Sequence, residues 1–124
     1  MRDPTAEFFA ELGDRRYVPL LDNIVGSVRF DLTQDGHTEH WHVTIRNGNV
    51  RIVREYRLAD CVARLDKMLF DAVVGGAASM MVQMLRGAVV VSGEAELFVQ
   101  FQRLFPAHAD VGGRQPMEAT GGVS

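Results

Sequence analysis

The sequence is poor in the residues that build disulfide scaffolds and nucleic-acid surfaces. It contains a single cysteine, Cys61, so no disulfide can form within the chain, and the core alone must hold the fold, as in a reducing compartment. Lys67 is the only lysine among thirteen basic residues. This preference for arginine is typical of GC-rich genomes and favours a bacterial source. A net charge of -3 argues against general affinity for nucleic acid.

Long apolar segments are also missing. The longest apolar runs, 72–74, 80–82 and 88–91, are far shorter than the roughly 20 residues that a membrane-spanning helix needs. The first residues, Met1 to Pro4, contain no long apolar stretch, so we expect no secretory signal peptide. We therefore expect a cytoplasmic protein.

The length of 124 residues suits one domain with a real core. Residues 107–124 are rich in glycine, alanine and small polar residues, which predicts a flexible C-terminal tail. We therefore place the single domain at residues 1–106.

The first half of the chain predicts one helix and then four strands. The pair Asp3-Pro4 indicates the start of a helix, and Gly13 its end. From residue 24 to 65 the apolar residues alternate with polar ones, as in strands with one buried face. Asn47-Gly48 is a strong hairpin signal, because both residues tolerate positive φ. The pattern predicts an antiparallel meander whose second face is charged and solvated.

The second half predicts two short helices, a strand and a last helix. Asp66 is a candidate cap for a helix over residues 67–74, and Ser79 for the next. A strand follows at 88–92 and a helix at 94–105. The helix after Ser79 is apolar on nearly every side and contains three methionines, so it needs partners all round.

These elements and their motifs, in this order, resemble the sterol carrier protein 2 domain family. The motifs are an aromatic strand on each side of a turn, a glycine hairpin, an alanine-aspartate pair, a leucine-rich helix that ends in glycine, and a five-residue strand between two glycines followed by an acid. In this chain they are Phe30-Asp31-Leu32, Trp41-His42-Val43, Asn47-Gly48-Asn49-Val50, Ala59-Asp60, Leu69 to Gly75, and Gly87 to Glu94.

The resemblance implies an α+β fold, in which a five-stranded, mostly antiparallel sheet is covered on one face by helices. It also implies non-catalytic binding or transfer of a lipid or another apolar molecule, in a cavity between sheet and helices. From the sequence alone, ordinary core packing is the preferred explanation of the methionine stripe, Met80, Met81 and Met84, whereas the resemblance makes it a cavity wall. The expected ligand-binding residues are Phe30, Trp41, Val43, Leu69, Val73, Met80, Met81, Met84, Leu85, Phe98, Phe101 and Phe105.

Two other functions stay open. The apolar helices could bury against a partner protein or a second copy, around a closed core without a ligand. Alternatively, His40 and His42 lie two apart on one strand face and could serve an enzyme or a metal site, although two ligands fall short of the usual three or four. We expect solvated histidines and neither a metal nor a cofactor. Serines lie in no Gly-x-Ser-x-Gly elbow, so we expect no catalytic residues.

The expected partner is an apolar small molecule such as a fatty acid, a sterol or a similar lipid, and we expect no nucleic acid. Transient membrane contact and a homodimer both stay open.

Overall fold

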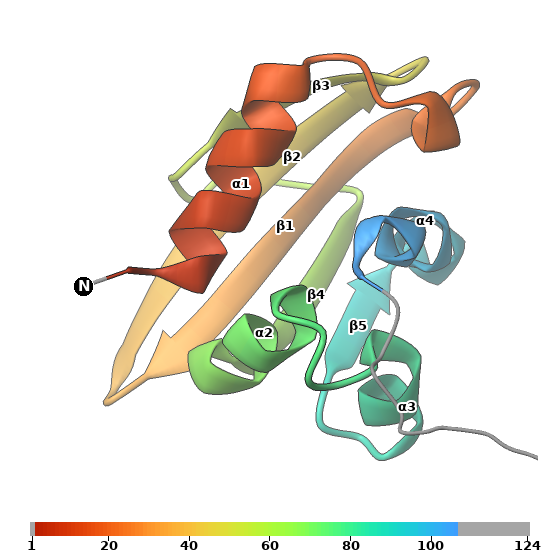
Figure 1. The fold of residues 1–124 in the computed structure, drawn as a ribbon. Coiled ribbons are helices and arrows are strands. Elements are labelled where there is room, and N and C mark those ends of the chain that lie inside the picture. The colour runs from red at the N-terminus through yellow and green to blue at the C-terminus, as the bar shows by residue number, and fades with distance from the viewer. Residues whose placement is uncertain (1, 107–124) are drawn as a thin grey trace, which may run out of the picture.

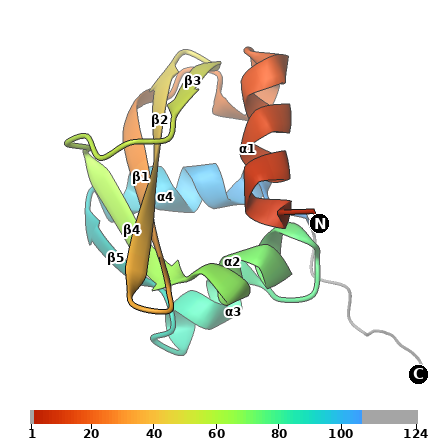
Figure 2. The same ribbon diagram turned by 90° about the vertical axis from the view of Figure 1, so that its left-hand side faces the viewer.

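A five-stranded sheet with helices packed on one face makes up the fold (Figure 1). The computed structural model describes residues 2–106, so the tail predicted for 107–124 lies outside the described residues. Turned by a quarter, the molecule shows α1 and α2 on the same side of the sheet (Figure 2). The α+β class predicted from the sequence is confirmed. Within residues 2–106, no helix is both long enough and apolar enough to cross a bilayer.

Helix α1 (Pro4–Arg15) starts as predicted but ends later. The side chain of Asp3 accepts hydrogen bonds from the backbone N–H groups of Thr5 and Ala6, which caps the helix. The prediction that Gly13 ends the helix is wrong. The helix continues until Arg16 takes a φ of 61° and turns the chain away. A short 3₁₀ turn, η1 (Pro19–Leu21), then buries Leu21 under the sheet.

The next three strands form two consecutive hairpins. They are β1 (Val25–Gln34), β2 (His37–Arg46) and β3 (Asn49–Val53), paired antiparallel. Their turns use Asp35-Gly36 and Asn47-Gly48, and all four residues have positive φ. The hairpin predicted at Asn47-Gly48 is therefore confirmed.

The fourth strand does not extend the meander. Strand β4 (Cys61–Asp66) pairs with β1, and it runs parallel to it. Strand β5 (Val90–Gly93) then pairs antiparallel with β4, so the sheet order is β3-β2-β1-β4-β5. The predicted meander is wrong at this point because alternation indicates which face a residue occupies, but not which strand lies beside it.

The helices of the second half follow the predicted order with shifted bounds. They are α2 (Lys67–Val74), α3 (Met80–Leu85), α4 (Ala95–Phe101) and the 3₁₀ turn η2 (Gln102–Leu104). Ser79 caps α3 as predicted, since its Oγ accepts from the N–H of Val82. Asp66 precedes α2 without capping it, because its carboxylate accepts from the Thr33 hydroxyl instead.

The face of the sheet away from the helices is not uniformly solvated. Arg29, Asp31 and His42 are buried there, and His40 is half-buried. The β3–β4 connection, residues 54–60, crosses this face and covers them (Figure 2). The predictions of a solvated face and of solvated histidines are therefore wrong at its centre.

Candidate functional site

The space between the sheet and the helices is occupied by aromatic side chains. All seven phenylalanines of the chain and its one tryptophan belong to a single group of rings in mutual contact. We call this group the aromatic cluster; its members are Phe8, Phe9, Phe30, Trp41, Phe70, Phe98, Phe101 and Phe105.

Phe30 of β1 lies at the centre of the aromatic cluster. Its ring centroid lies 5.4 Å from that of Phe101 and 5.3 Å from that of Phe70. From the other side, the ring centroid of Phe9 lies 5.6 Å from that of Phe30. Phe9 also stacks on Trp41, with the two ring centroids 4.5 Å apart. Such separations are typical of directly packed aromatic pairs. Side chains therefore fill the space around Phe30.

The structure buries eight of the twelve predicted site residues and half-buries two. The buried residues of the sheet face the helices, and the buried residues of the helices face the sheet. They are Phe30, Trp41, Val43, Val73, Met80, Phe98, Phe101 and Phe105, and the half-buried pair is Leu69 and Met84. Burial places these ten where a ligand between sheet and helices would contact them, and their role in binding stays a prediction.

The other two predicted residues lie on the surface. Met81 is exposed and Leu85 is 84% exposed, so neither faces the sheet. The expected place of Met81 and Leu85 in a wall between sheet and helices is therefore wrong, whereas Met80 and Met84 do face the interior. The reason is that α3 has six residues and packs through only one face.

Sequence reasoning left three members of the aromatic cluster out of the site: Phe8, Phe9 and Phe70. Phe8 and Phe9 lie on α1, and Phe70 lies on α2 next to the predicted site residue Leu69. Counting phenylalanines would have found all three, because every one in the chain belongs to the aromatic cluster.

A hollow of about 200 Å³ opens beside the aromatic cluster. It lies between α1, the end of α2 and the last described residues, and Phe8 belongs to both the hollow and the aromatic cluster. Its other lining residues are Glu11, Leu12, Arg15, Val74, Leu104 and Pro106. The hollow is smaller than the 300–1,000 Å³ usual for small-molecule sites. A larger ligand must therefore displace side chains of the aromatic cluster.

The mouth of this hollow is charged. Glu11 and Arg15 are four residues apart on α1 and both line it. Arg15 forms no ion pair with an acidic group of residues 2–106, so its guanidinium is available to an anion. A hollow with apolar side chains in part of its wall and the Arg15 guanidinium in another part suits an amphiphile with an anionic end.

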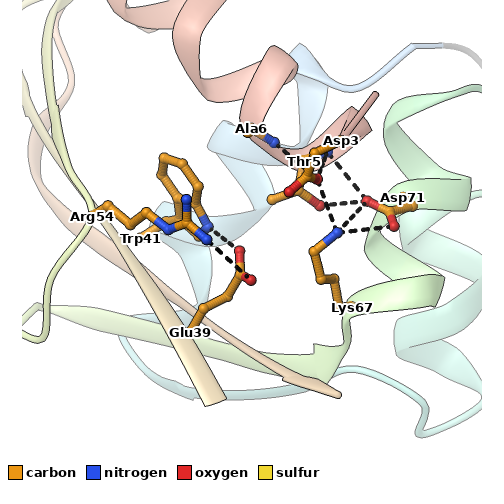
Figure 3. Close-up of polar contacts among 8 residues, drawn as sticks. All are labelled: Asp3, Thr5, Ala6, Glu39, Trp41, Arg54, Lys67 and Asp71. Carbon is orange, nitrogen blue, oxygen red and sulfur yellow. Dashed lines mark hydrogen bonds and ion pairs between the residues drawn. The ribbon is translucent and has the colours of Figure 1, made fainter. Parts of the chain in front are cut away.

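A buried lysine ties α1 to α2 at the other end of α1 (Figure 3). Lys67 Nζ lies 2.9 Å from Asp3 Oδ1 and 3.1 Å from Asp71 Oδ2, and Thr5 donates to the same Asp71 carboxylate. Burial by itself lowers the pKa of Lys67, but the hydrogen bonds to Asp3 and Asp71 outweigh it and hold the pKa above its ordinary value. This group fixes the start of α1 and has no free position for a ligand.

Trp41 has polar contacts at one edge of the aromatic cluster (Figure 3). Its indole N–H donates to Glu39 Oε2 at 2.6 Å, and the guanidinium carbon of Arg54 lies 4.9 Å from the ring centroid. Arg54 also pairs with Glu39 at 3.5 Å. These contacts hold the indole in one orientation against Phe9.

The groups that could carry chemistry are engaged elsewhere. Burial raises the pKa of the Cys61 thiol to about 11. His40 Nδ1 lies 2.7 Å from Asp31, and His42 Nε2 donates to the Leu58 carbonyl at 3.1 Å. In the described part of the chain no three His, Cys, Asp or Glu side chains come together as a metal site would need.

Comparison with solved structures supports the fold. Sterol carrier protein 2 like 2 of Aedes aegypti is 14% identical over 82% of this chain and 95% of its own, with a TM-score of 0.64. Sterol carrier protein 2 of the same mosquito, in complex with the C16 fatty acid palmitate, is 21% identical over 83% and 94%, with a TM-score of 0.65.

The same fold also occurs as part of a longer chain. The sec-alkylsulfatase Pisa1 from a Pseudomonas species is 18% identical over 81% of this chain, with a TM-score of 0.64, but the match spans only 16% of the sulfatase. No curated protein matches the chain in sequence.

The match to a family model covers most of the chain. The model of the SCP-2 sterol transfer family aligns with residues 8–106, which run from the first phenylalanine of the aromatic cluster to the proline at the hollow. The range contains all five strands, which also agree in order and layering with the solved sterol carrier structures. By sequence and by fold, the chain belongs to the SCP-2 sterol transfer family.

Proposed function

We propose that this protein binds a lipid or a similar apolar small molecule between its sheet and its helices, and carries it without catalysis. The observation that carries the proposal is the aromatic cluster, which gathers every phenylalanine of the chain beside a hollow whose wall is partly apolar. A neighbour with the same fold holds palmitate, which supports a fatty acid as one ligand.

The ligand would enter at the hollow between α1 and η2. Entry separates the stacked rings of Phe8 and Phe105, whose centroids lie 5.3 Å apart, and an acyl chain then replaces ring contacts with its own. Each methylene group transferred from water contributes about 0.8 kcal/mol. An empty protein whose rings fill the site and a loaded one whose rings have moved apart are the two states of this carrier.

Arg15 supplies the polar end of the site. It lines the mouth of the hollow and has no acidic partner within residues 2–106, so a fatty acid could pair its carboxylate there with its chain towards Phe8. Phenylalanine and methionine side chains reject few apolar shapes. The protein would therefore discriminate between ligands by their polar end more than by their apolar chain.

Two observations favour a carrier over an enzyme. The Cys61 thiol is buried, with its pKa raised to about 11, and the hydroxyl of Ser27 is bonded to Asp60. Neither of these two potential nucleophiles lines the hollow. A carrier of this kind would work in the cytoplasm, the compartment that the single cysteine favours.

The test is the state of the purified protein. Native mass spectrometry and organic extraction should recover an apolar ligand, and the extracted protein should bind a fluorescent fatty acid that palmitate displaces. A protein that is reproducibly empty, and that binds neither fatty acyl nor sterol probes, would overturn the proposal.

A second candidate function is an interaction module with a closed core. It is favoured by the direct ring contacts around Phe30 and by apolar side chains exposed on the short helices, with Met68 73% and Leu85 84% exposed. Light scattering separates the two, since this candidate requires a dimer or a bound protein and no ligand.

A further inference from the structure

We propose that the outer face of the sheet, away from the helices, is a docking surface for a protein segment that carries an acidic side chain beside an apolar one. The surface consists of the β3–β4 connection, residues 54–60, and a hollow next to it over β4 and β5. It is independent of lipid binding, which uses the opposite face of the sheet.

Side chains of the sheet hold the second half of the β3–β4 connection. Arg29 donates to the carbonyl of Arg57 at 3.0 Å, and His42 donates to that of Leu58 at 3.1 Å. At its end, the N–H of Asp60 donates to Ser27 Oγ at 3.0 Å, and the Ser27 N–H returns a bond to the Asp60 carboxylate. These bonds restrict the backbone of the connection at Arg57, Leu58 and Asp60 before any partner binds.

Buried charged groups lie under this connection. The Arg29 guanidinium donates twice to Asp31, at 2.8 and 3.1 Å, and His40 contacts the same carboxylate. Within residues 2–106, Nδ1 of His42 is buried without a hydrogen-bond partner, because the ring uses its other nitrogen to hold Leu58. A buried ring nitrogen without a hydrogen-bond partner costs free energy, so the His42 orientation that holds Leu58 has a cost in stability.

The side chains on this fixed backbone point away from the protein. Leu58 is 85% exposed and Tyr56 is 59% exposed, although the Tyr56 ring lies over the Arg29 guanidinium at 4.2 Å. A flexible loop would lose conformational entropy on binding, whereas this one has already lost it. Tyrosine and arginine side chains are also over-represented at the centre of protein interfaces.

The adjoining hollow determines the chemistry of the partner. It has a volume of about 270 Å³ and is lined by Arg29, Asp31, Val62, Arg64, Val90 and Ser92. The Asp31 charge is satisfied by Arg29, and Arg64 approaches it with one nitrogen only, at 3.8 Å. The Arg64 side chain is 65% exposed, so its remaining N–H groups can pair with a carboxylate of the partner, while Leu58 and the 60% exposed Val90 cover an apolar neighbour.

The experiment pans the intact protein against a displayed library of random peptides of about twelve residues. Selected peptides should combine Asp or Glu with an apolar residue. Their affinity should fall at least about tenfold for Leu58→Ser and for Arg64→Glu, the loss expected at the centre of an interface.

Matched controls lie on α3 and just after it, away from this surface. Leu85 is 84% exposed, nearly the same as Leu58, and Arg86 is an exposed arginine. Leu85→Ser and Arg86→Glu should leave peptide affinity unchanged. Failure to select peptides, or equal losses in the test and control variants, would overturn the proposal.

Two further outcomes would show that this surface binds something other than the proposed protein segment, and either would overturn the proposal. The first is a dimer in light scattering that Leu58→Ser abolishes, which would make a second copy the partner. The second is co-sedimentation with vesicles of anionic phospholipid that Arg64→Glu abolishes, which would make a membrane the partner. Because all four variants keep the aromatic cluster intact, fatty acid binding reports separately on the lipid proposal.

Discussion

Phe8 and Phe105 stack with their ring centroids 5.3 Å apart and their planes 26° from parallel, and both rings meet Phe70 edge-on. This pair joins the first helix to the end of the last one. Replacing one ring tests both its structural role and its proposed role at the ligand entrance.

Phe8→Ala should lower the free energy of unfolding by about 1–3 kcal/mol in urea, because a half-buried ring loses its stacking partner. It should also speed the uptake of a fluorescent fatty acid, since the entrance no longer has to open. Val99→Ala, on an exposed position of α4, is the control and should change neither quantity. Unchanged stability in Phe8→Ala would contradict the stacking seen here.

Arg15→Gln should weaken the binding of a fatty acid but leave that of the fatty alcohol of equal length unchanged. The reason is that Arg15, in the proposed complex, would meet only the charged end of the ligand. Arg86→Gln, on an exposed arginine away from the hollow, should alter neither affinity. Equal losses for acid and alcohol would show that Arg15 does not select the carboxylate.

Two glycines with nearly the same backbone conformation should respond differently to alanine. Gly87 has a φ of 83° and Gly93 a φ of 85°, so alanine strains either position by roughly 1–2 kcal/mol. A Cβ at Gly87 would meet nothing, whereas one at Gly93 would overlap the backbone carbonyl of Asp60. Gly93→Ala should therefore have the clearly lower midpoint in thermal unfolding, and equal midpoints would contradict this packing.

Asp31 should make stability depend on pH in the acid range. Burial by itself raises the pKa of Asp31, but hydrogen bonds from Arg29 and His40 outweigh it and hold the pKa below its ordinary value. The stability it contributes is therefore complete above the unfolded pKa of about 3.9 and is lost as the pH falls through the lower, folded value.

Asp31→Asn should cost about 3 kcal/mol at pH 7, because Arg29 loses its buried partner. Below pH 4 the difference from the parent protein should shrink. Asp35→Asn, in the exposed β1–β2 turn, is the control. A constant difference from pH 7 down to pH 3 would contradict the role given to the carboxylate.

Cys61 should resist modification in the folded protein. The thiol is buried and its pKa is raised to about 11, so little thiolate is present or accessible at pH 8. Iodoacetamide should label it only on addition of denaturant, as followed by mass spectrometry. Rapid labelling without denaturant would show that β4 opens readily.

The sequence predicted local features of the fold well, but it predicted poorly which strands pair with one another. Alternation in β1 and β2 placed Phe30 and Trp41 on the core face, and Asn47-Gly48 located a hairpin, because both signals depend on a few adjacent residues. The partner of β4 could not be predicted in this way. Its alternation of Cys61, Ala63 and Leu65 is the same beside β1 as beside β3.

The same limit applied to the candidate site. The burial of His42 depends on a loop sixteen residues further along the chain, which no periodicity in β2 indicates. Leu85 and Met80 are both apolar residues of an apolar helix, so the sequence does not distinguish them. Only the position of α3 in the fold leaves Leu85 exposed and Met80 buried. The phenylalanines were more informative, because large aromatic rings in a small protein share one core.

The parallel pairing of β4 with β1 also affects synthesis of the chain. By the time β3 has left the ribosome, β1 is bonded along one side only, and its other side stays unpaired until residues 61–66 follow. An open strand edge invites pairing with another nascent chain. Mutations that slow the docking of β4 should therefore reduce the soluble yield in cells more than they reduce the stability of the finished protein.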